Sequence, residues 1–283
     1  MRVLWITSDF WPSRGGIETY TEQVTNHLVL KGCLVSLITT DGQWLPDRSL
    51  LSEHKAIARL DRPSCEKSFG DISAGIAAAI ASFRPQVVHF ASAGLAVYAN
   101  AIPLGLPRVV TVHGNDLTKP WQRWPAGDVN EAIRNGLAGC RIIFSVSRHT
   151  ASLLTSAGLK HPVRIIHNSC DFETFAPRQI DREAVLSRHG VDPHCCVLLT
   201  VSRLVPRKGH STVLAALELI DRSVHWLVVG EGRSLELLRN SHARGRTAFP
   251  RDVRRERSAP GIGGALQCLR YFRAHPCRNT AWP

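Results

Sequence analysis

Short apolar runs recur along the first 230 residues, and the segments between them alternate apolar and polar positions with helical spacing. The runs are four to six residues long and rich in Val, Ile and Leu, which is typical of parallel strands buried on both faces. They predict strands over Val3–Thr7, Leu34–Thr39, Val87–Phe90, Val109–Val112, Ile142–Val146, Val163–Ile166, Val197–Val201 and Val224–Val229.

The segments between these runs predict helices over Ile17–Lys31, Ile72–Phe83, Thr150–Ala157 and Thr212–Ile220. The first three are followed within two positions by glycine or proline, which are residues that end helices. A chain that alternates strands and helices in this way folds with parallel sheets. The expected fold class is therefore α/β.

One stretch interrupts this alternation and predicts a domain boundary. Residues 168–195 carry prolines and many charges but no apolar run, and a new strand begins directly after them. We therefore expect a complete N-terminal Rossmann-like domain over residues 1–170, a linker over 171–195 and a partial second domain over 196–240. Residues 241–283 show no apolar periodicity and are expected to form a disordered, arginine-rich tail.

The composition is globular, with 44% hydrophobic and 20% charged residues and no apolar run long enough to cross a bilayer. The net charge of +12 would suggest a nucleic-acid partner, but residues 241–283 supply +7 of it, from nine arginines against Asp252 and Glu256. Eight cysteines show no Cys-x-x-Cys spacing, which predicts reduced thiols, a cytoplasmic location and no metal site. Asp9 and Pro12 interrupt the first apolar run too early for a signal peptide.

A glycine pair follows the first predicted strand, in "PSRGGIETY" at residues 12–20. Gly15 and Gly16 let the backbone approach a ligand, and the helix that begins there offers free N–H groups to an anion. The spacing differs from Gly-x-Gly-x-x-Gly, which argues against an ordinary dinucleotide site. An ordinary turn, with Glu18 stabilising the first turn of the helix, explains the pattern equally well.

His113 leaves the carboxyl end of the predicted strand Val109–Val112, where open α/β sheets gather ligand-binding groups. A neutral imidazole there can hydrogen-bond a sugar hydroxyl or transfer a proton, and the structural alternative is a loop histidine bonded to backbone. Ser147 is expected mainly to cap the helix after it. Asn168 and Asp171 are expected to shape a polar turn.

The most specific signal is "VSRLVPRKG" at residues 201–209, which places Arg203 and Lys208 between a buried strand and the start of a helix. Gly209 has no side chain where a phosphate would approach. Cationic donors and a helix N-terminus can stabilise the charge that develops on a leaving diphosphate. Because the sequence has no Asp-x-Asp pair, we expect this stabilisation to be independent of a metal.

A second loop, "VGEG" at residues 229–232, ends the next strand. Its residues Gly230, Glu231 and Gly232 expose backbone and are expected to contact the base or ribose of a nucleotide.

Taken in order, these motifs resemble the retaining glycosyltransferases of family 4, whose GT-B architecture consists of two Rossmann-like domains. The resemblance covers residues 1 to about 240. It is carried by Gly15-Gly16-Ile17-Glu18, His113-Gly114, Ser147-Arg148-His149-Thr150, Asn168 to Asp171, "VSRLVPRKG" and "VGEG". Ser169 and Cys170 depart from the usual Asn-Gly-Val-Asp of the family, a mild change that the turn should tolerate.

The resemblance implies a nucleoside diphosphate sugar as donor substrate, a saccharide or lipid-linked saccharide as acceptor, and neither a cofactor nor a nucleic-acid partner. It implies that Arg203 and Lys208 bind the donor diphosphate, that Gly16 approaches the diphosphate from the other domain, and that His113 faces the transferred sugar. Transfer would retain the anomeric configuration. Peripheral attachment to the inner face of a membrane stays open.

The resemblance ends near Asn240, where the family would continue to two glutamates that hold the donor sugar and ribose. One choice of codons for residues 265–275, read one base later, gives Leu-Tyr-Asn-Ala-Cys-Asp-Ile-Phe-Ala-Leu, which is similar to the family's segment before those glutamates. We therefore expect a frameshift near residues 240–250, a truncated second domain and negligible transferase activity.

Two other functions are weighed against this one. A nucleotide-sugar epimerase of similar fold would need carboxylates for acid–base chemistry, and Asp116 is the nearest candidate. A nucleic-acid-binding protein could use the basic tail, but the tail lacks interleaved aromatic residues.

Overall fold

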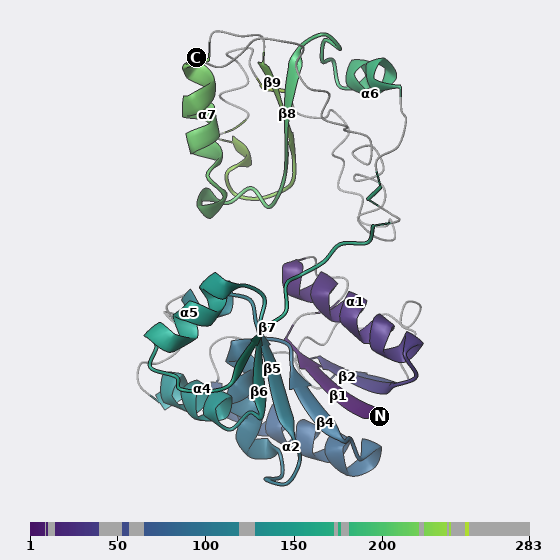
Figure 1. Ribbon diagram of the computed structural model, residues 1–283, viewed down its shortest axis with the longest axis vertical. Coiled ribbons are helices and arrows are strands. Elements are labelled where there is room, and N and C mark those ends of the chain that lie inside the picture. Colours follow the sequence, from purple (N-terminus) through teal and green to yellow (C-terminus); the bar gives the residue numbers. More distant parts are fainter. Residues whose placement is uncertain are drawn as a thin grey trace. The chain divides into compact units, whose positions relative to one another are not determined.

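The computed structural model describes residues 1–8, 10, 15–39, 53–56, 65–118, 128–172, 175–176, 181–220, 224–236, 238 and 247–248. The chain divides into two compact units, unit 1 with residues 1–169 and unit 2 with residues 170–283, which are described separately below (Figure 1).

The described residues of unit 1 form a seven-stranded sheet with the order β3-β2-β1-β4-β5-β6-β7. Every neighbouring pair in it is parallel, so the carboxyl ends of all strands lie at one edge. The strands are β1 (Arg2–Thr7), β2 (Leu34–Thr39), β3 (Glu53–Ala56), β4 (Val87–Phe90), β5 (Arg108–Val112), β6 (Ile142–Ser145) and β7 (Val163–Ile165). The order reverses direction after β3, which makes the sheet doubly wound as predicted.

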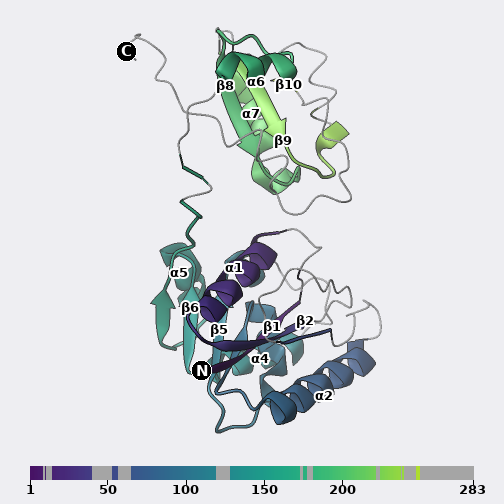
Figure 2. The same cartoon turned by 90° about the vertical axis from the view of Figure 1, so that its right-hand side faces the viewer.

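Helices connect these strands and cover the sheet. They are α1 (Gly16–Leu30), α2 (Cys65–Phe83), the 3-10 helix η2 (Ala93–Ala101), α3 (Asn115–Thr118), α4 (Asp128–Ala138) and α5 (Arg148–Ser156). Helices α1 and α2 lie on opposite faces of the sheet (Figure 2). Helix α4 packs so closely on η2 that a Cβ at Gly136 would overlap the backbone carbonyl of Ala96.

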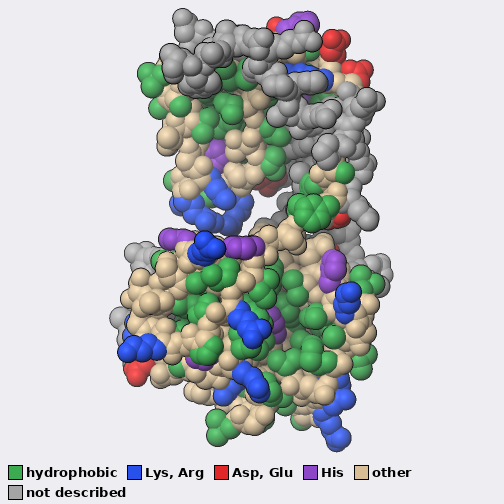
Figure 3. Space-filling view, in the orientation of Figure 1, with side chains coloured by type: hydrophobic (Ala, Val, Ile, Leu, Met, Phe, Trp, Pro, Cys, Tyr) green, Lys and Arg blue, Asp and Glu red, His purple; other side chains and the backbone are tan. Residues whose placement is uncertain are grey.

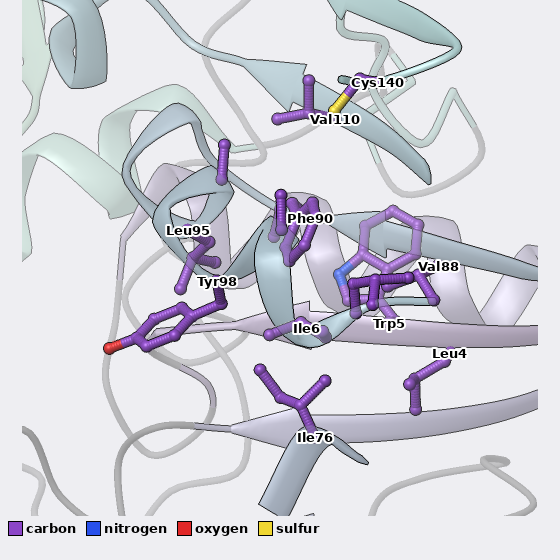
Figure 4. Close-up of a cluster of buried hydrophobic side chains, with 14 of the residues drawn as sticks. Leu4, Trp5, Ile6, Ile76, Val88, Phe90, Leu95, Tyr98, Val110 and Cys140 are labelled. Atoms are coloured by element: carbon purple, nitrogen blue, oxygen red, sulfur yellow. The ribbon is translucent and has the colours of Figure 1, made fainter. Parts of the chain in front are cut away.

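The core of unit 1 forms around β1, whose residues Leu4, Trp5 and Ile6 are fully buried. Val88 and Phe90 from β4 pack with them in the same cluster (Figure 4). Burial of each such large side chain contributes about 1.5–3 kcal/mol to folding. This core holds the carboxyl ends of β1, β4 and β5 in a fixed arrangement, on which the candidate site is built.

Unit 2 contains a parallel sheet with the order β10-β9-β8 among its described residues. Its elements are α6 (Arg182–Arg188), β8 (Cys196–Val201), the 3-10 helix η3 (Pro206–Lys208), α7 (His210–Glu218), β9 (Val224–Val229) and β10 (Thr247–Ala248). A smaller core of Leu204, Leu217, Trp226, Val228 and Leu238 joins α7 to the sheet.

Two details differ from the sequence-based expectation for this half of the chain. Residues 171–195, expected to be a linker, include helix α6, which Asp181 caps by accepting a hydrogen bond from Ala184 N–H at 2.9 Å. Within the expected tail, Thr247 and Ala248 pair in parallel with β9. The rest of 241–283, and with it the expected disorder, lies outside the described residues.

Candidate functional site

The glycine pair lies at the start of helix α1, at the carboxyl edge of the sheet of unit 1. Gly15 is the N-cap residue in an extended conformation, and its carbonyl accepts hydrogen bonds from the backbone N–H and the hydroxyl of Thr19. A Cβ at Gly15 would overlap the Glu18 carboxylate, whereas a Cβ at Gly16 would have no heavy atom within 4 Å. Gly16 therefore leaves open space at the start of a helix, where free N–H groups attract anions.

His113 lies directly after β5, and hydrogen bonds fix both its backbone and its ring. Its backbone N–H donates to Asp116 Oδ1 at 2.9 Å, while Asp116 Oδ2 accepts from Ala93 N–H at 2.9 Å. The ring nitrogen Nε2 lies 3.0 Å from the carbonyl oxygen of Ala91. Asp116 thus joins the loops that follow β4 and β5, and both of its oxygens are used for this purpose.

The surroundings of His113 keep its ring neutral. Desolvation by burial lowers the pKa of His113 from its ordinary value, and the charges of Asp116 and Glu18 together with the hydrogen bond to Ala91 oppose this shift in part. A neutral imidazole can accept a hydrogen bond on one nitrogen while it donates from the other.

A row of hydrogen-bonded polar side chains next to His113 crosses the otherwise apolar core. Thr111 Oγ1 lies 3.2 Å from Tyr20 Oη and 2.9 Å from His89 Nε2. The His89 ring stacks on Trp5, with centroids 3.8 Å apart. Burial, together with a smaller effect of the nearby His113, lowers the pKa of His89 to about 3.

The sequence analysis missed His89 and Tyr20. His89 lies inside the apolar run "VVHF", which predicts a buried strand and no separate role for the histidine. One signal for His89 is its position near the carboxyl end of β4. This strand pairs with β5, the strand that precedes His113.

In unit 2, hydrogen bonds between backbones join the loops after β8 and β9. Ser202 N–H donates to Val229 O at 3.0 Å, and Leu204 N–H donates to Glu231 O at 2.7 Å. A Cβ at Gly230 would overlap the carbonyl of Ser202, and one at Gly232 would overlap that of Leu204. Gly230 and Gly232 therefore allow the two loops to pack against each other. The sequence predicted only a contact of these residues with a base or ribose, and that contact stays a prediction.

The basic loop of unit 2 leads directly into helix α7. Arg203, Arg207 and Lys208 are exposed, and Lys and Arg side chains gather at the end of unit 2 that carries this loop (Figure 3). Gly209 caps α7 in the left-handed conformation, with φ 71° and ψ 21°, which favours glycine. The Thr212 N–H donates to Gly209 O at 3.0 Å, whereas the N–H groups of His210 and Ser211 have no acceptor among the described residues. Cations and free N–H donors therefore occur together here.

The buried side chain of His210 contacts the start of this loop. It is 2% exposed, and its Nε2 lies 3.1 Å from the hydroxyl of Ser202, the residue before Arg203. Its ring lies beside Trp226, with centroids 6.2 Å apart. Burial of this histidine fixes the start of the basic loop relative to the first residue of α7.

The described residues contain no group of three or more His, Cys, Asp or Glu arranged to hold a metal ion. None of the helices described here has the combined length and apolarity needed to span a membrane.

The structure places Gly16 and His113 at the carboxyl edge of the sheet of unit 1, and Arg203 and Lys208 in the basic loop of unit 2.

Comparison with known proteins gives a family and solved structures that share the fold. A family profile described as Glycosyltransferase Family 4 matches residues 14–174. A GDP-mannose-dependent alpha-(1-6)-phosphatidylinositol monomannoside mannosyltransferase of Mycobacterium tuberculosis is 30% identical over 252 residues. The match covers 84% of this chain and 63% of that protein, so the chain spans less than two thirds of the relative's length.

Two solved structures share the fold at low sequence identity. A sucrose-phosphate synthase of Thermosynechococcus elongatus has a TM-score of 0.64 at 16% identity, covering 88% of this chain and 69% of that one. Anabaena Alr3699/HepE in complex with UDP has a TM-score of 0.66 at 16% identity, covering 88% and 68%. These likenesses agree with the α/β, GT-B type fold expected from the sequence.

Proposed function

The chain belongs to glycosyltransferase family 4, and on that premise we propose that its chemistry is transfer of a sugar from a nucleoside diphosphate donor to a hydroxyl acceptor. The negligible rate of transfer expected from the sequence for this chain is part of the proposal. The observation that carries the proposal is the basic loop of unit 2. Arg203 and Lys208 are exposed beside the free N–H groups at the start of α7. Fixed cations and oriented N–H groups are the donors that a departing diphosphate needs.

In this proposal, Arg203 and Lys208 bind the donor diphosphate and stabilise the charge that grows on it as the glycosidic bond breaks. Loss of one such donor typically lowers the rate about a hundredfold to a thousandfold. Among the described residues, neither side chain forms an ion pair. As far as these residues are concerned, both positive charges are therefore available to bind a ligand.

His113 positions the transferred sugar through a neutral ring. Asp116 accepts two backbone hydrogen bonds, which makes it a structural carboxylate and not a nucleophile. We therefore favour attack on the same face that the diphosphate leaves, with retained configuration and without a covalent intermediate on the enzyme.

The mycobacterial relative supports GDP-mannose as the first donor to test and a lipid-linked saccharide as acceptor, because its name specifies GDP-mannose and phosphatidylinositol monomannoside. A cytoplasmic location would give access to a nucleotide-sugar donor and agrees with the proposal.

The test is a single-turnover incubation with GDP-mannose and phosphatidylinositol monomannoside, with protein in excess so that slow transfer still gives measurable product. The expected product carries an α-linked mannose, identified by the one-bond carbon–proton coupling of its anomeric centre. A β-linked product would contradict retention. Absence of any GDP-mannose binding in a parallel titration would contradict the donor assignment.

The alternatives gain no support. The comparisons favour neither an epimerase nor a nucleic-acid-binding protein, and the one carboxylate named for epimerase chemistry, Asp116, is engaged by Ala93 and His113. The basic tail invoked for nucleic acid falls outside the described residues, apart from Thr247 and Ala248.

A further inference from the structure

The ring of His113 is held on two sides. Its Nε2 lies 3.0 Å from Ala91 O, a carbonyl at the end of β4. The ring of Tyr20, one helical turn after Gly16 in α1, meets it edge to face, with centroids 4.9 Å apart and an angle of 78° between the planes. Two different elements therefore determine the orientation of one imidazole.

The contact with Ala91 identifies the tautomer. A carbonyl oxygen can only accept a hydrogen bond, so the proton must lie on Nε2 of His113. In a neutral ring, Nδ1 then carries a lone pair and no proton. Among the described residues, no hydrogen bond to this Nδ1 is present.

Tyr20 is itself fixed at both ends. Its hydroxyl lies 3.2 Å from Thr111 Oγ1 on β5, two residues before His113, and its ring also lies near Trp5, with centroids 6.2 Å apart. Burial raises the pKa of Tyr20, with the hydrogen bond to Thr111 acting in the opposite direction, so the hydroxyl stays protonated. Edge-to-face aromatic contacts of this kind restrict the relative orientation of the two rings.

We propose that Tyr20 is a positioning residue that keeps the His113 ring against Ala91 O and so in the Nε2–H tautomer. The unprotonated Nδ1 is then the atom that accepts a hydrogen bond from the transferred sugar, which the family resemblance places beside His113. The ligand part of this inference rests on the proposed glycosyltransferase function, whereas the tautomer and the role of Tyr20 do not. The group recognised is a hydroxyl that donates, so an ether or fluorine at the same position would not replace it.

The charges around the ring make this arrangement sensitive to acid. Burial disfavours the imidazolium of His113, while Asp116, the hydrogen bond to Ala91 and Glu18 favour it. Protonation would turn Nδ1 from an acceptor into a donor. Because the pKa of His113 is lowered, the acceptor is retained at neutral pH and is lost at a lower pH than in an ordinary histidine.

The direct test is NMR of the histidine rings in the uniformly ¹⁵N-labelled full chain, with the His113 signals assigned by their loss in His113→Gln. At pH 7.5 we expect Nε2 of His113 to bear the proton and Nδ1 to give the signal of an unprotonated nitrogen. A proton on Nδ1, or on both nitrogens, would overturn the tautomer assignment.

The role of Tyr20 is tested with Tyr20→Leu, which removes the ring, and Tyr20→Phe, which retains the ring and removes the hydroxyl. We expect a mixture of tautomers at His113 in Tyr20→Leu and the single tautomer in Tyr20→Phe. Tyr98→Phe, which alters a buried tyrosine that stacks on Phe69, is the matched control. An unchanged His113 spectrum in a folded Tyr20→Leu protein would contradict the positioning role.

Titration with GDP-mannose and with GDP separates the ligand claim from the proposed function. GDP-mannose should shift the Nδ1 signal of His113, and GDP alone should not. Tyr20→Leu should bind GDP-mannose about threefold to tenfold more weakly than the wild type, as expected for one hydrogen bond, with GDP affinity unchanged. GDP-mannose binding without a shift of Nδ1 overturns the ligand claim, whereas failure of both ligands to bind contradicts the donor proposal and leaves the tautomer test standing.

Discussion

At the scale of single residues, the buried histidine His89 links the stability of unit 1 to pH. Its ring is stacked on Trp5 and hydrogen-bonded to Thr111, so a charge on it would be poorly solvated. The pKa of about 3 in the folded state lies well below the ordinary value of 6.5 for histidine. The unfolded chain therefore binds a proton in a pH range where the folded chain does not.

The sign of the effect follows from this difference. The stabilisation associated with neutral His89 is complete above about pH 6.5 and is lost as the pH falls toward 3. Below about pH 6, the free energy of unfolding should decrease with a slope that is steeper in the wild type than in His89→Gln, by up to about 1.4 kcal/mol per pH unit.

Urea unfolding followed by far-UV circular dichroism at pH 7, 6, 5 and 4.5 measures these slopes. His149→Gln, which changes an exposed histidine of α5, controls for the loss of a histidine elsewhere. Parallel pH curves for the wild type and His89→Gln would show that the buried ring has no such effect.

The residue scale also shows which parts of the site the sequence could predict. Ser147 was expected to cap a helix, and its hydroxyl accepts a hydrogen bond from Thr150 N–H at 3.0 Å, which confirms the prediction. His113 could be singled out because it follows a recognisable strand. Tyr20 and Thr111 could not, because their importance arises from a contact between α1 and β5, which are 91 positions apart at these residues.

At the scale of elements, the loops after β8 and β9 form one unit through their backbones. The glycines of "VGEG" permit this contact, since Gly230 has φ 155° and its absent Cβ would overlap Ser202 O. The loop after β8 carries Arg203, so the position of Arg203 depends on the contact of this loop with the loop after β9.

Gly230→Ala should therefore destabilise unit 2 by about 2 kcal/mol, through steric overlap and backbone strain. Amide hydrogen exchange, measured by mass spectrometry on peptides that cover β8 and β9, should become faster. Gly70→Ala is the control, because a Cβ there has no heavy atom within 4 Å. Unchanged exchange in Gly230→Ala would contradict the packing role of this glycine.

Most strands were predictable at this scale because each is a continuous apolar run, although the expected burial on both faces does not hold for β7 and β8, whose residues are partly buried or exposed. The observed bounds of β2, β4 and β9 match the predicted ranges, and β1, β5, β6, β7 and β8 differ by one residue at one end. Strand β3 was missed because "EHKA" has no apolar run. Helix η2 was missed because "AGLAVYANA" is apolar apart from Gly94 and Asn100, without helical alternation.

At the scale of the molecule, each unit has a core of its own. The core of unit 1 consists of residues between Val3 and Leu154, and the main core of unit 2 consists of residues between Leu204 and Leu238. Units with separate cores can fold as separate domains.

A fragment of residues 1–169 should therefore unfold cooperatively and retain the near-UV circular dichroism of packed aromatic residues such as Trp5. Thermal unfolding of the fragment beside the full chain is the measurement. A broad transition without a near-UV signal would show that unit 1 depends on unit 2 for its folding.

The central claim is that the basic loop of unit 2 binds the diphosphate of the donor, and calorimetric titration with GDP tests it most directly. The wild type and Lys160→Ala, which removes an exposed lysine of unit 1, should bind GDP alike. Arg203→Ala/Lys208→Ala should bind at least tenfold more weakly, because two charge-assisted hydrogen bonds are lost. Equal affinity in the double variant, with its fold intact by circular dichroism, would contradict the account.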